Sequence, residues 1–444
     1  SYGLENQGPP TPIASDFCDN GVINSVGEDS PAIPGSEAGL TVRLTTVPVG
    51  QSQTFTILFV FGSSPDASVY NWENLRGQNI EQLADNFWNN RLFQLTQGVP
   101  HVKLNDSVLE KIYYNSLLNI PMNLFDNGTN KKFYGLGDTT YVLEFPWQTI
   151  SSAKIWTWAD PLGFKDTFKN FLKIDMTNCK AYNPLTNQPS CFSFYAFDPS
   201  SLILSIYDYL TISQDWGFLS ENISGNISGT PKNQTVIEWL RELAYLRESV
   251  GSTNLVDFGN DHALFEFREP TCNLRGLYTG QVPTPNAERY TTHKRLGEIY
   301  RKIGDPRANG EETVAQDAKA ALTQLWNATE GWFDSISLYE PAQSTYQQPI
   351  PLRNTPLRNT FKGIWIYHLL DYPGLLTSQQ TTQLLTHLDE YRAPFGFYSL
   401  SKTVQSNWCS RQDWHGPGLY IGEAGRMIKT LSQNGRSDLA LDIL

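Results

Sequence analysis

The sequence predicts a mainly α fold, in which a helical toroid of the (α/α)6 type or an irregular helical solenoid follows a small portion of a β-sandwich. From about residue 79 onward, helix-length segments with apolar residues at helical spacing alternate with long loops rich in Gly, Pro and aromatic residues. Before that point the chain differs, because it holds strand-like segments. No fixed-period repeat of the usual solenoid kind is found.

Residues 1–75 are predicted to form the β-sandwich portion with its linker, and residues 76–444 the helical domain. Residues 39–47 and 52–61 alternate or run apolar as strands do, with a turn at 48–51 between them. Because two strands do not make a stable sheet alone, we expect a partner chain or a missing segment to complete this sandwich.

The helical domain is predicted from amphipathic stretches such as 236–246, where apolar residues recur at i, i+3, i+4 and i+7. The predicted helices cover residues 79–95, 106–119, 163–174, 199–213, 234–249, 286–303, 311–329, 358–371, 377–390 and 418–433. The predicted loops cover residues 127–162, 176–198, 215–233, 251–284, 332–357 and 392–418. Loops of this length inside a compact fold are normally functional.

The composition argues against several kinds of partner. The formal net charge is −12 and 18% of residues are charged, which does not suit binding to nucleic acid. No apolar run approaches the roughly 18 residues of a membrane-spanning helix. Aromatic residues make up 13% of the chain. By default they are core residues, but with the low charge and the many Asn, Gln and Thr residues they also favour contact with carbohydrate.

The sequence indicates a secreted or lumenal eukaryotic glycoprotein. Cys179 and Cys191 bracket a short polar loop and are predicted to form a disulfide, while Cys18, Cys272 and Cys409 leave an odd count. No signal peptide is visible, so we expect a mature or partial chain. Glycosylation sequons occur at Asn105, Asn127, Asn222, Asn226, Asn233 and Asn327.

The segment 411–425 holds the densest group of chemically active side chains. Asp413, Trp414 and His415 precede a Gly-Pro-Gly corner, and an apparent helix with Glu423 follows. Tight backbone beside Trp and two carboxylates is typical of a sugar-cleaving site, and the alternative is a surface loop that caps a helix. Asp413 or Glu423 is the candidate general base, although Glu423 could equally be an acid favoured by the helix dipole.

A second segment, 134–163, contains Asp138 and, further on, a cluster of Trp156, Trp158 and Asp160. Both tryptophans are predicted to bind sugar, because a pyranose ring can stack on indole while a carboxylate accepts hydrogen bonds from its hydroxyls. Asp160 also fits the N-cap of the next helix, since a proline follows it. These two interpretations of Asp160 are compatible.

The loop 254–272 supplies the candidate general acid. Glu266 lies between two phenylalanines, and an apolar surround raises the pKa of a carboxyl so that it can hold a proton. The alternative is a half-buried strand at 263–267 with Glu266 on its wet face. Asp257 is a second candidate. No nucleophile elbow, P-loop, HExxH or dinucleotide motif is present, and the six histidines lack ligand spacing, so we expect no cofactor and no metal.

The order of segments resembles the (α/α)6-barrel glycoside hydrolases related to trehalase, processing α-glucosidase and α-rhamnosidase. Residues 256–266, followed by Pro-Asn-Ala-Glu-Arg-Tyr at 285–290 opening a helix, resemble the general-acid loop of that group. Residues 414–418 resemble its Trp-Arg-Gly-Pro helix entrance, with His415 in the place of the arginine. The resemblance covers about residues 76–444.

The resemblance implies hydrolysis of a neutral oligo- or polysaccharide by carboxylate acid/base catalysis, with inversion at the anomeric carbon. The usual acid of the group is an Asp in a Gly-Trp-Asp setting, and here Asp257, Asp261 and Glu266 compete for that role. In several of these enzymes the base is a Glu well beyond the Gly-Pro entrance. The alternative to Asp413 or Glu423 as base is therefore a catalytic pair that is incomplete in this chain.

Two rival functions remain open at this point. A polysaccharide lyase on a similar toroid would use Tyr420 and His415 as acid and base, although a uronate site needs local Arg or Lys. A non-catalytic glycan-binding or structural extracellular protein, derived from a glycosidase fold, would need neither catalytic carboxylate.

Overall fold

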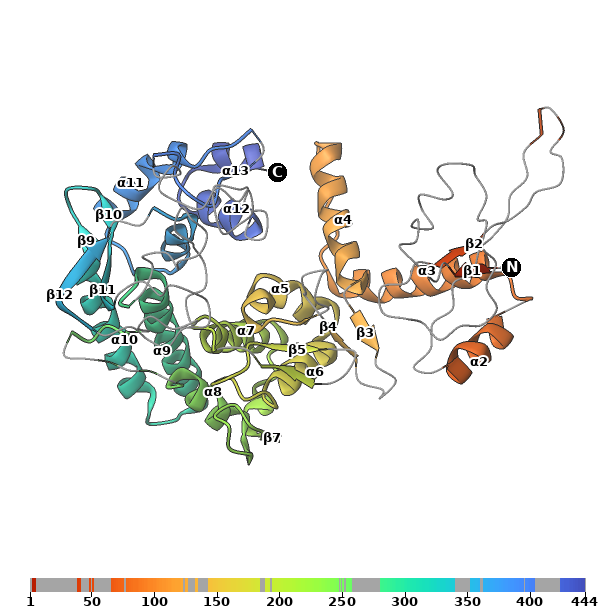
Figure 1. The fold of residues 1–444 in the computed structure, drawn as a ribbon, viewed down its shortest axis with the longest axis horizontal. Helices are drawn as coiled ribbons and strands as arrows, with labels where there is room; N and C mark the ends of the chain where they lie inside the picture. Colours follow the sequence, from red (N-terminus) through yellow and green to blue (C-terminus); the bar gives the residue numbers. More distant parts are fainter. Residues whose placement is uncertain are drawn as a thin grey trace. The chain divides into compact units, whose positions relative to one another are not determined.

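The computed structural model describes residues 2–4, 38–40, 48, 50–51, 65–75, 77–122, 124–126, 132–134, 143–183, 188–191, 194–246, 248, 250, 253–257, 280–339, 352–359, 362–394, 396–403 and 424–443. The chain divides into two compact units, Ser1–Leu83 and Ala84–Leu444. The ribbon in Figure 1 is coloured along the sequence and labels many of the elements used below. No helix among the described residues has the length and hydropathy that crossing a membrane requires.

The first unit contains one described strand pair and a short helix. Strand β1 (Tyr2–Leu4) pairs antiparallel with β2 (Ala38–Leu40). Helix α2 (Pro65–Leu75) begins with a proline and has an acidic residue in its first turn, both of which favour a helix start. The strands predicted at 39–47 and 52–61 lie almost entirely outside the described residues, so the β-sandwich stays a prediction.

The second unit is mainly α, as predicted. Its helices, with α3 beginning in the first unit, are α3 (Ile80–Gly98), α4 (Ser107–Met122), α5 (Pro146–Ala159), α6 (Pro161–Phe171), α7 (Asp198–Ser213), α8 (Val236–Ala244), α9 (Pro283–Ile303), α10 (Ala308–Leu322), α11 (Ser378–Thr386), α12 (Ala424–Gln433) and α13 (Ser437–Ile443). The 3₁₀ helices are η1 (Trp216–Ser220), η3 (Thr323–Leu325), η4 (Ile364–Asp371) and η5 (Leu388–Glu390).

The described strands of this unit form only two-stranded antiparallel sheets. The pairs are β3 (Leu124–Asp126) with β4 (Lys132–Tyr134), β5 (Ala181–Asn183) with β6 (Gln188–Ser190), β7 (Asn222–Gly225) with β8 (Lys232–Thr235), β9 (Trp326–Asn327) with β10 (Trp332–Phe333), and β11 (Ser335–Tyr339) with β12 (Leu352–Asn359).

The helices pack on one another largely in the order of the sequence. Helix α5 packs on α7, α7 on α9, α9 on α10 and η4, η4 on α12, and α12 on α13. This succession agrees with the predicted (α/α)6 toroid, in which each helix pair contacts the next pair along the chain. Figure 1 shows α9 beside α10 within this succession.

Helix α9 lies at the centre of the packing. Nearly every side chain from its start to Tyr300 is buried. Its N-terminal half contributes Ala287 and Tyr290 to one apolar cluster, and its C-terminal half contributes Leu296 to another. Gly297 lets α10 approach closely, because a Cβ there would lie 3.2 Å from the carbonyl oxygen of Ala308. A helix buried on this scale fixes whatever its first turns carry.

Several predicted elements differ from the structure. Helix α5 occupies part of the predicted loop 127–162; apolar residues are spread around it rather than confined to one stripe, so no helical periodicity is visible in the sequence. The helix predicted at 358–371 is instead the end of β12 followed by η4. The helix predicted at 311–329 ends at Leu322, because β9 and β10 pair as a hairpin just beyond it.

Candidate functional site

The start of the predicted general-acid loop is bound to the first turn of α9. The backbone N–H of Val256 donates to Asn286 Oδ1 at 2.8 Å, and Asn286 Nδ2 donates back to the carbonyl oxygen of Val256 at 3.2 Å. The same amide nitrogen donates to the carbonyl oxygen of Val282 at 2.8 Å, where the helix begins. Asn286 is 1% exposed. The backbone that leads into half-buried Asp257 is therefore held at the N-terminus of a buried helix.

A small, open pocket of about 50 Å³ lies beside this contact. It is bounded by the start of α7, the chain after α8 and the first turns of α9. Much of its lining is apolar, and the polar groups that it contains are those of Ser200, Glu248, Glu288, Arg289 and Thr292. The hydroxyl of Thr292 is buried and has no hydrogen-bond partner among the described residues. A concave, mostly apolar site with a few convergent polar groups is the usual form of a small-molecule site.

Glu288 is the more buried of the two carboxylates that line the pocket. The Ser200 hydroxyl donates to its Oε2 at 2.5 Å, and the Tyr372 hydroxyl donates to its Oε1 at 3.2 Å. The residue is 5% exposed, and a carboxylate this buried needs such donors. Its place in the second turn of α9 is also close to the positive end of the helix dipole, which favours a negative charge.

The other pocket carboxylate, Glu248, begins a chain of opposite charges. It forms an ion pair with Arg289, and its Oε1 lies 3.6 Å from Nε2 of His293. The other ring nitrogen of His293, Nδ1, lies 2.6 Å from Glu311 Oε2 on α10. The Tyr245 hydroxyl donates to the same carboxylate at 3.1 Å. These contacts tie the end of α8 to α9 and α10.

The pKa values of His293 and Glu248 are shifted within this chain of charges. Burial by itself lowers the pKa of His293, but the neighbouring carboxylates of Glu248 and Glu311 outweigh burial and raise it. Burial raises the pKa of Glu248, but His293 and the charge of Arg289 outweigh burial and lower it. His293 therefore favours its charged form beside two carboxylates.

A further buried carboxyl, Glu144, stands apart from both groups. It is 1% exposed, and neither side-chain oxygen has a hydrogen-bond partner in the part of the chain that the structure describes. Burial raises the pKa of Glu144 well above its usual range. The backbone of Glu144 bridges to Tyr182, so the side chain is enclosed by the way the chain is paired at this point.

The predicted sugar platform is corrected in part by the structure. Trp156 and Trp158 lie on helix α5 rather than in a loop. Trp156 is 2% exposed and belongs to an apolar core cluster, so neither face of its indole is open to a sugar. Trp158 is 44% exposed and stays available. Asp160 caps α6, because its Oδ1 accepts from the N–H of Gly163 at 2.9 Å.

The remaining predicted site residues lie outside the described residues, and their roles stay predictions. They are Asp138, Asp261, Glu266, Asp413, Trp414, His415, Tyr420 and Glu423. Among the described residues, no group of His, Cys, Asp and Glu is arranged to hold a metal ion. The absence of a catalytic metal is still an expectation from the sequence.

The sequence alone does not single out the polar residues that the structure brings together around α9. Glu288 is visible only as one letter of the Pro-Asn-Ala-Glu-Arg-Tyr motif, and His293 carries no signal of its own. Their partners Tyr372 and Glu311 come from other helical elements. A usable signal would have been a glutamate among otherwise apolar or small residues at the start of a long helix.

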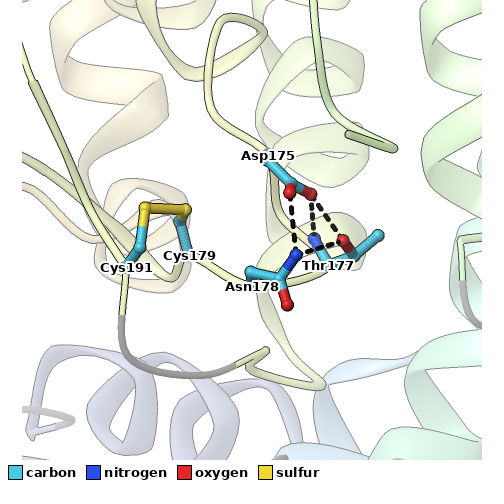
Figure 2. Close-up of a disulfide and its surroundings, with 5 residues drawn as sticks. All are labelled: Asp175, Thr177, Asn178, Cys179 and Cys191. Atoms are coloured by element: carbon cyan, nitrogen blue, oxygen red, sulfur yellow. Dashed lines mark hydrogen bonds between the residues drawn. A yellow bond between two sulfur atoms is a disulfide. The ribbon is translucent and has the colours of Figure 1, made fainter. Parts of the chain in front are cut away.

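The predicted disulfide between Cys179 and Cys191 is confirmed. It closes the β5–β6 hairpin, as Figure 2 shows. Next to it the Asp175 carboxylate accepts from the backbone N–H and hydroxyl of Thr177 and from the side-chain amide of Asn178. Burial raises the pKa of Asp175, but these hydrogen bonds outweigh burial and lower it. The other cysteines lie outside the described residues.

The predicted glycosylation acceptors differ in exposure. Those with exposed side chains are Asn105, Asn222 and Asn233; those half-buried are Asn226 and Asn327; and Asn127 lies outside the described residues.

No protein-family model matches the chain, and no curated protein matches it in sequence. Similar solved structures include a GH63 mannosylglycerate hydrolase from Thermus thermophilus in complex with glucose, with 11% identity over 74% of this chain and 88% of that chain at a TM-score of 0.48. A rhamnosidase from Klebsiella oxytoca with rhamnose bound has 13% identity over 77% of this chain and 55% of that chain at a TM-score of 0.47.

An uncharacterised conserved protein from Thermus thermophilus is similar at the same level, with 12% identity, a TM-score of 0.46, and cover of 74% of this chain and 88% of that chain. At such identities a likeness concerns the fold alone. No residue role is carried over from these structures, and the site rests on the contacts described above.

Proposed function

We propose that this protein is a glycoside hydrolase that cleaves a neutral oligo- or polysaccharide by carboxylate acid/base catalysis. The proposal rests on the two hydrogen bonds between the Asn286 side chain and the backbone of Val256, where the predicted acid-bearing loop begins. It fixes the backbone next to Asp257 against a buried helix, beside a pocket lined by two further carboxylates. Catalytic groups need supporting contacts of this kind to keep their geometry.

In the proposed reaction, Glu266 or Asp257 donates a proton to the glycosidic oxygen as the bond from that oxygen to the anomeric carbon breaks. Asp413 or Glu423 removes a proton from a water that attacks the anomeric carbon from the opposite face. The products are a free alcohol and a sugar of inverted configuration. Inversion requires the two carboxyl groups to lie roughly 6.5–9.5 Å apart, and a separation of about 5 Å would give retention instead.

Substrate contacts in this proposal come from Trp158, Trp414, His415 and Asp138. Indole faces suit the CH faces of a neutral sugar, and the low overall charge of the protein does not suit a polyanionic one. We also propose that the protein is a secreted glycoprotein, because a disulfide persists in oxidising compartments and several sequon asparagines have exposed side chains.

The proposal is tested by hydrolysis of a panel of neutral oligosaccharides and aryl glycosides, with NMR to identify the anomer that forms first. Asp257→Asn, Glu266→Gln and Asp413→Asn are measured in parallel. The variant of the true acid or base is expected to lose at least about 100-fold in kcat. Glu298→Gln is the matched control, since Glu298 pairs with Arg295 on the outer part of α9.

Each rival function has its own outcome in this experiment. Unchanged activity in all the carboxylate variants would reject the proposed mechanism. An unsaturated product that absorbs in the ultraviolet would identify a lyase. Glycan binding without any turnover would identify a non-catalytic protein.

A further inference from the structure

A buried relay of hydrogen bonds connects α9 to α12. Arg426 Nη2 donates to the Tyr372 hydroxyl oxygen at 2.7 Å, and that hydroxyl donates to Glu288 Oε1 at 3.2 Å. The Ser200 hydroxyl of α7 donates to the other oxygen of Glu288. The relay therefore joins α7, α9, the residue that follows η4, and α12. Each of these elements comes from a different part of the chain.

The side chains of the relay are buried, and their hydrogen-bond donors and acceptors match. Ser200, Glu288 and Tyr372 are 8%, 5% and 6% exposed, and the Arg426 side chain is 10% exposed. Burial raises the pKa of Tyr372 well above its usual range, and Arg426 only partly opposes this effect. The hydroxyl thus stays protonated, and one group can accept from Arg426 while it donates to Glu288.

Ion pairs fix the arginine end of the relay. Arg426 Nε lies 3.5 Å from Asp371 Oδ2, and Lys429 Nζ lies 2.7 Å from Asp371 Oδ1. Asp371 is the last residue of η4 and directly precedes Tyr372. Asp371 at the end of η4 and Tyr372 just after it therefore bind the first two turns of α12. The relative placement of these elements is thus fixed by directional polar contacts and not by apolar packing alone.

In the sequence, each end of the relay lies in the helix that follows one of the two catalytic segments proposed above. Glu288 lies in the second turn of α9, directly after the loop that holds Asp257 and Glu266. Arg426 lies in the first turn of α12, directly after the segment that holds Asp413 and Glu423. The structure thus links the helix after the acid loop to the helix after the base segment.

We propose that Glu288, Tyr372 and Arg426 are positioning residues that set the spacing between the acid-bearing and base-bearing sides of the site. The inference rests on the proposed function. An inverting reaction depends on that spacing, and misplacement of a catalytic group by about 1 Å can lower the rate about 100-fold. Each of the two helices that the relay joins directly follows one of these segments in the sequence.

Tyr372→Phe is the most selective test, since it removes one hydroxyl and leaves the ring in place. We expect amide hydrogen exchange at residues 424–430 to become about tenfold faster or more, and exchange in α10 to stay unchanged. Tyr300→Phe is the matched control, because the Tyr300 hydroxyl is also buried but has no hydrogen-bond partner within the described ranges. It should leave exchange at 424–430 unchanged.

Activity supplies the second arm. If the wild type hydrolyses a glycoside, Tyr372→Phe and Glu288→Gln should lower kcat at least about tenfold with a smaller change in KM, and Tyr300→Phe should change neither. A merely structural relay would instead change stability and leave kcat of the folded enzyme intact, which would overturn the inference.

The exchange arm keeps the inference separate from the proposed function. Unchanged exchange at 424–430 in Tyr372→Phe would overturn the relay whatever the activity. Faster exchange there in a protein that hydrolyses no glycoside would overturn the proposed function, and with it the catalytic meaning of the relay, while the link itself would stand.

Discussion

Helix α9 is held by two buried carboxylates that have different partners. Glu288 accepts from the hydroxyls of Ser200 and Tyr372, whereas Glu311 contacts the imidazole of His293. The two carboxylates are similarly enclosed, at 5% and 4% exposure. One therefore depends on neutral donors and the other on a base that can carry charge. The difference determines which side of the helix responds to pH.

The partners also set how costly each contact is to break. On the imidazole side, Arg289, Glu248, His293 and Glu311 alternate in charge, so removing one leaves a buried charge without its partner. On the hydroxyl side, removing one donor leaves a polar group that keeps another donor. We expect the imidazole side to contribute more to stability and the hydroxyl side to contribute more to the geometry of the site.

The largest effect is expected for Glu311→Ala. It leaves His293 beside Glu248 alone, and breaking a buried ion pair in this way costs about 3–5 kcal/mol of unfolding free energy. Urea unfolding measures the loss. Glu312→Ala is the matched control on the same helix, because Glu312 is partly exposed and pairs loosely with Arg301 at 3.6 Å. It should cost less than about 1 kcal/mol. Equal losses would contradict the comparison.

The pH dependence of stability separates the two sides next. Because the pKa of His293 is raised in the folded state, its stabilising effect is full below the unfolded pKa of about 6.5 and is lost as pH rises through the folded value. Between pH 6 and 9, the wild type should lose unfolding free energy that His293→Gln does not lose.

Tyr372→Phe provides the contrasting case for that measurement. The Tyr372 hydroxyl keeps its proton in this range, since its pKa is raised well above its usual value. The loss of stability in this variant should therefore be the same at pH 6 and pH 9. A loss that changes with pH would show that the relay responds to pH as well, and would remove the distinction between the two sides.

Glu144 differs from both of these carboxylates, because it is buried and has no hydrogen-bond partner among the described residues. Burial raises the pKa of Glu144, so the folded state holds a proton that the unfolded chain releases above about pH 4.5. The free energy of unfolding therefore falls as pH rises from there toward the pKa of Glu144 in the folded state. Glu144→Gln removes this penalty and should raise the unfolding free energy at pH 7. Exposed Glu238→Gln is the control. Unchanged stability in Glu144→Gln would mean that the carboxyl gains a partner in solution.

The sequence was sufficient where a signal is local. Helix α9 was predicted within a few residues of its true bounds, because prolines begin it and Gly304 ends it with a positive φ. The disulfide between Cys179 and Cys191 was predicted from a short polar loop. The capping role of Asp160 followed from the proline after it.

Where a signal depends on partners distant in the sequence, prediction was incomplete or wrong. Trp156 was predicted to stack on sugar, yet it fills the core, because only the packing of α5 on α7 decides which way the indole points. Glu288 meets Ser200 and Tyr372, and each lies more than 80 residues away in the chain. No spacing rule within one segment could have brought these three residues together.

The smallest effect that we expect concerns two hairpins whose asparagine side chains differ in their partners. On β7–β8, Asn222 is opposite Thr235 and Asn233 is opposite Ser224, and both asparagine side chains are exposed. On β9–β10, Asn327 Nδ2 donates to Asp334 Oδ2 at 3.1 Å, and its Oδ1 accepts from two backbone N–H groups at 3.2 Å. A glycan on Asn327 would break these bonds, whereas one on Asn222 or Asn233 would extend into solvent.

Expression in a eukaryotic secretory host, followed by glycosidase treatment and peptide mass spectrometry, should find Asn222 and Asn233 modified and Asn327 unmodified. Asn222→Gln should change the unfolding free energy by less than about 0.5 kcal/mol, since it is a surface substitution without a partner to lose. Asn327→Gln should cost about 1 kcal/mol, because a longer side chain cannot make the same turn bonds. Full occupancy at Asn327 would mean that this hairpin forms other contacts in the mature protein, and that engaged side chains do not decide which sequons are used.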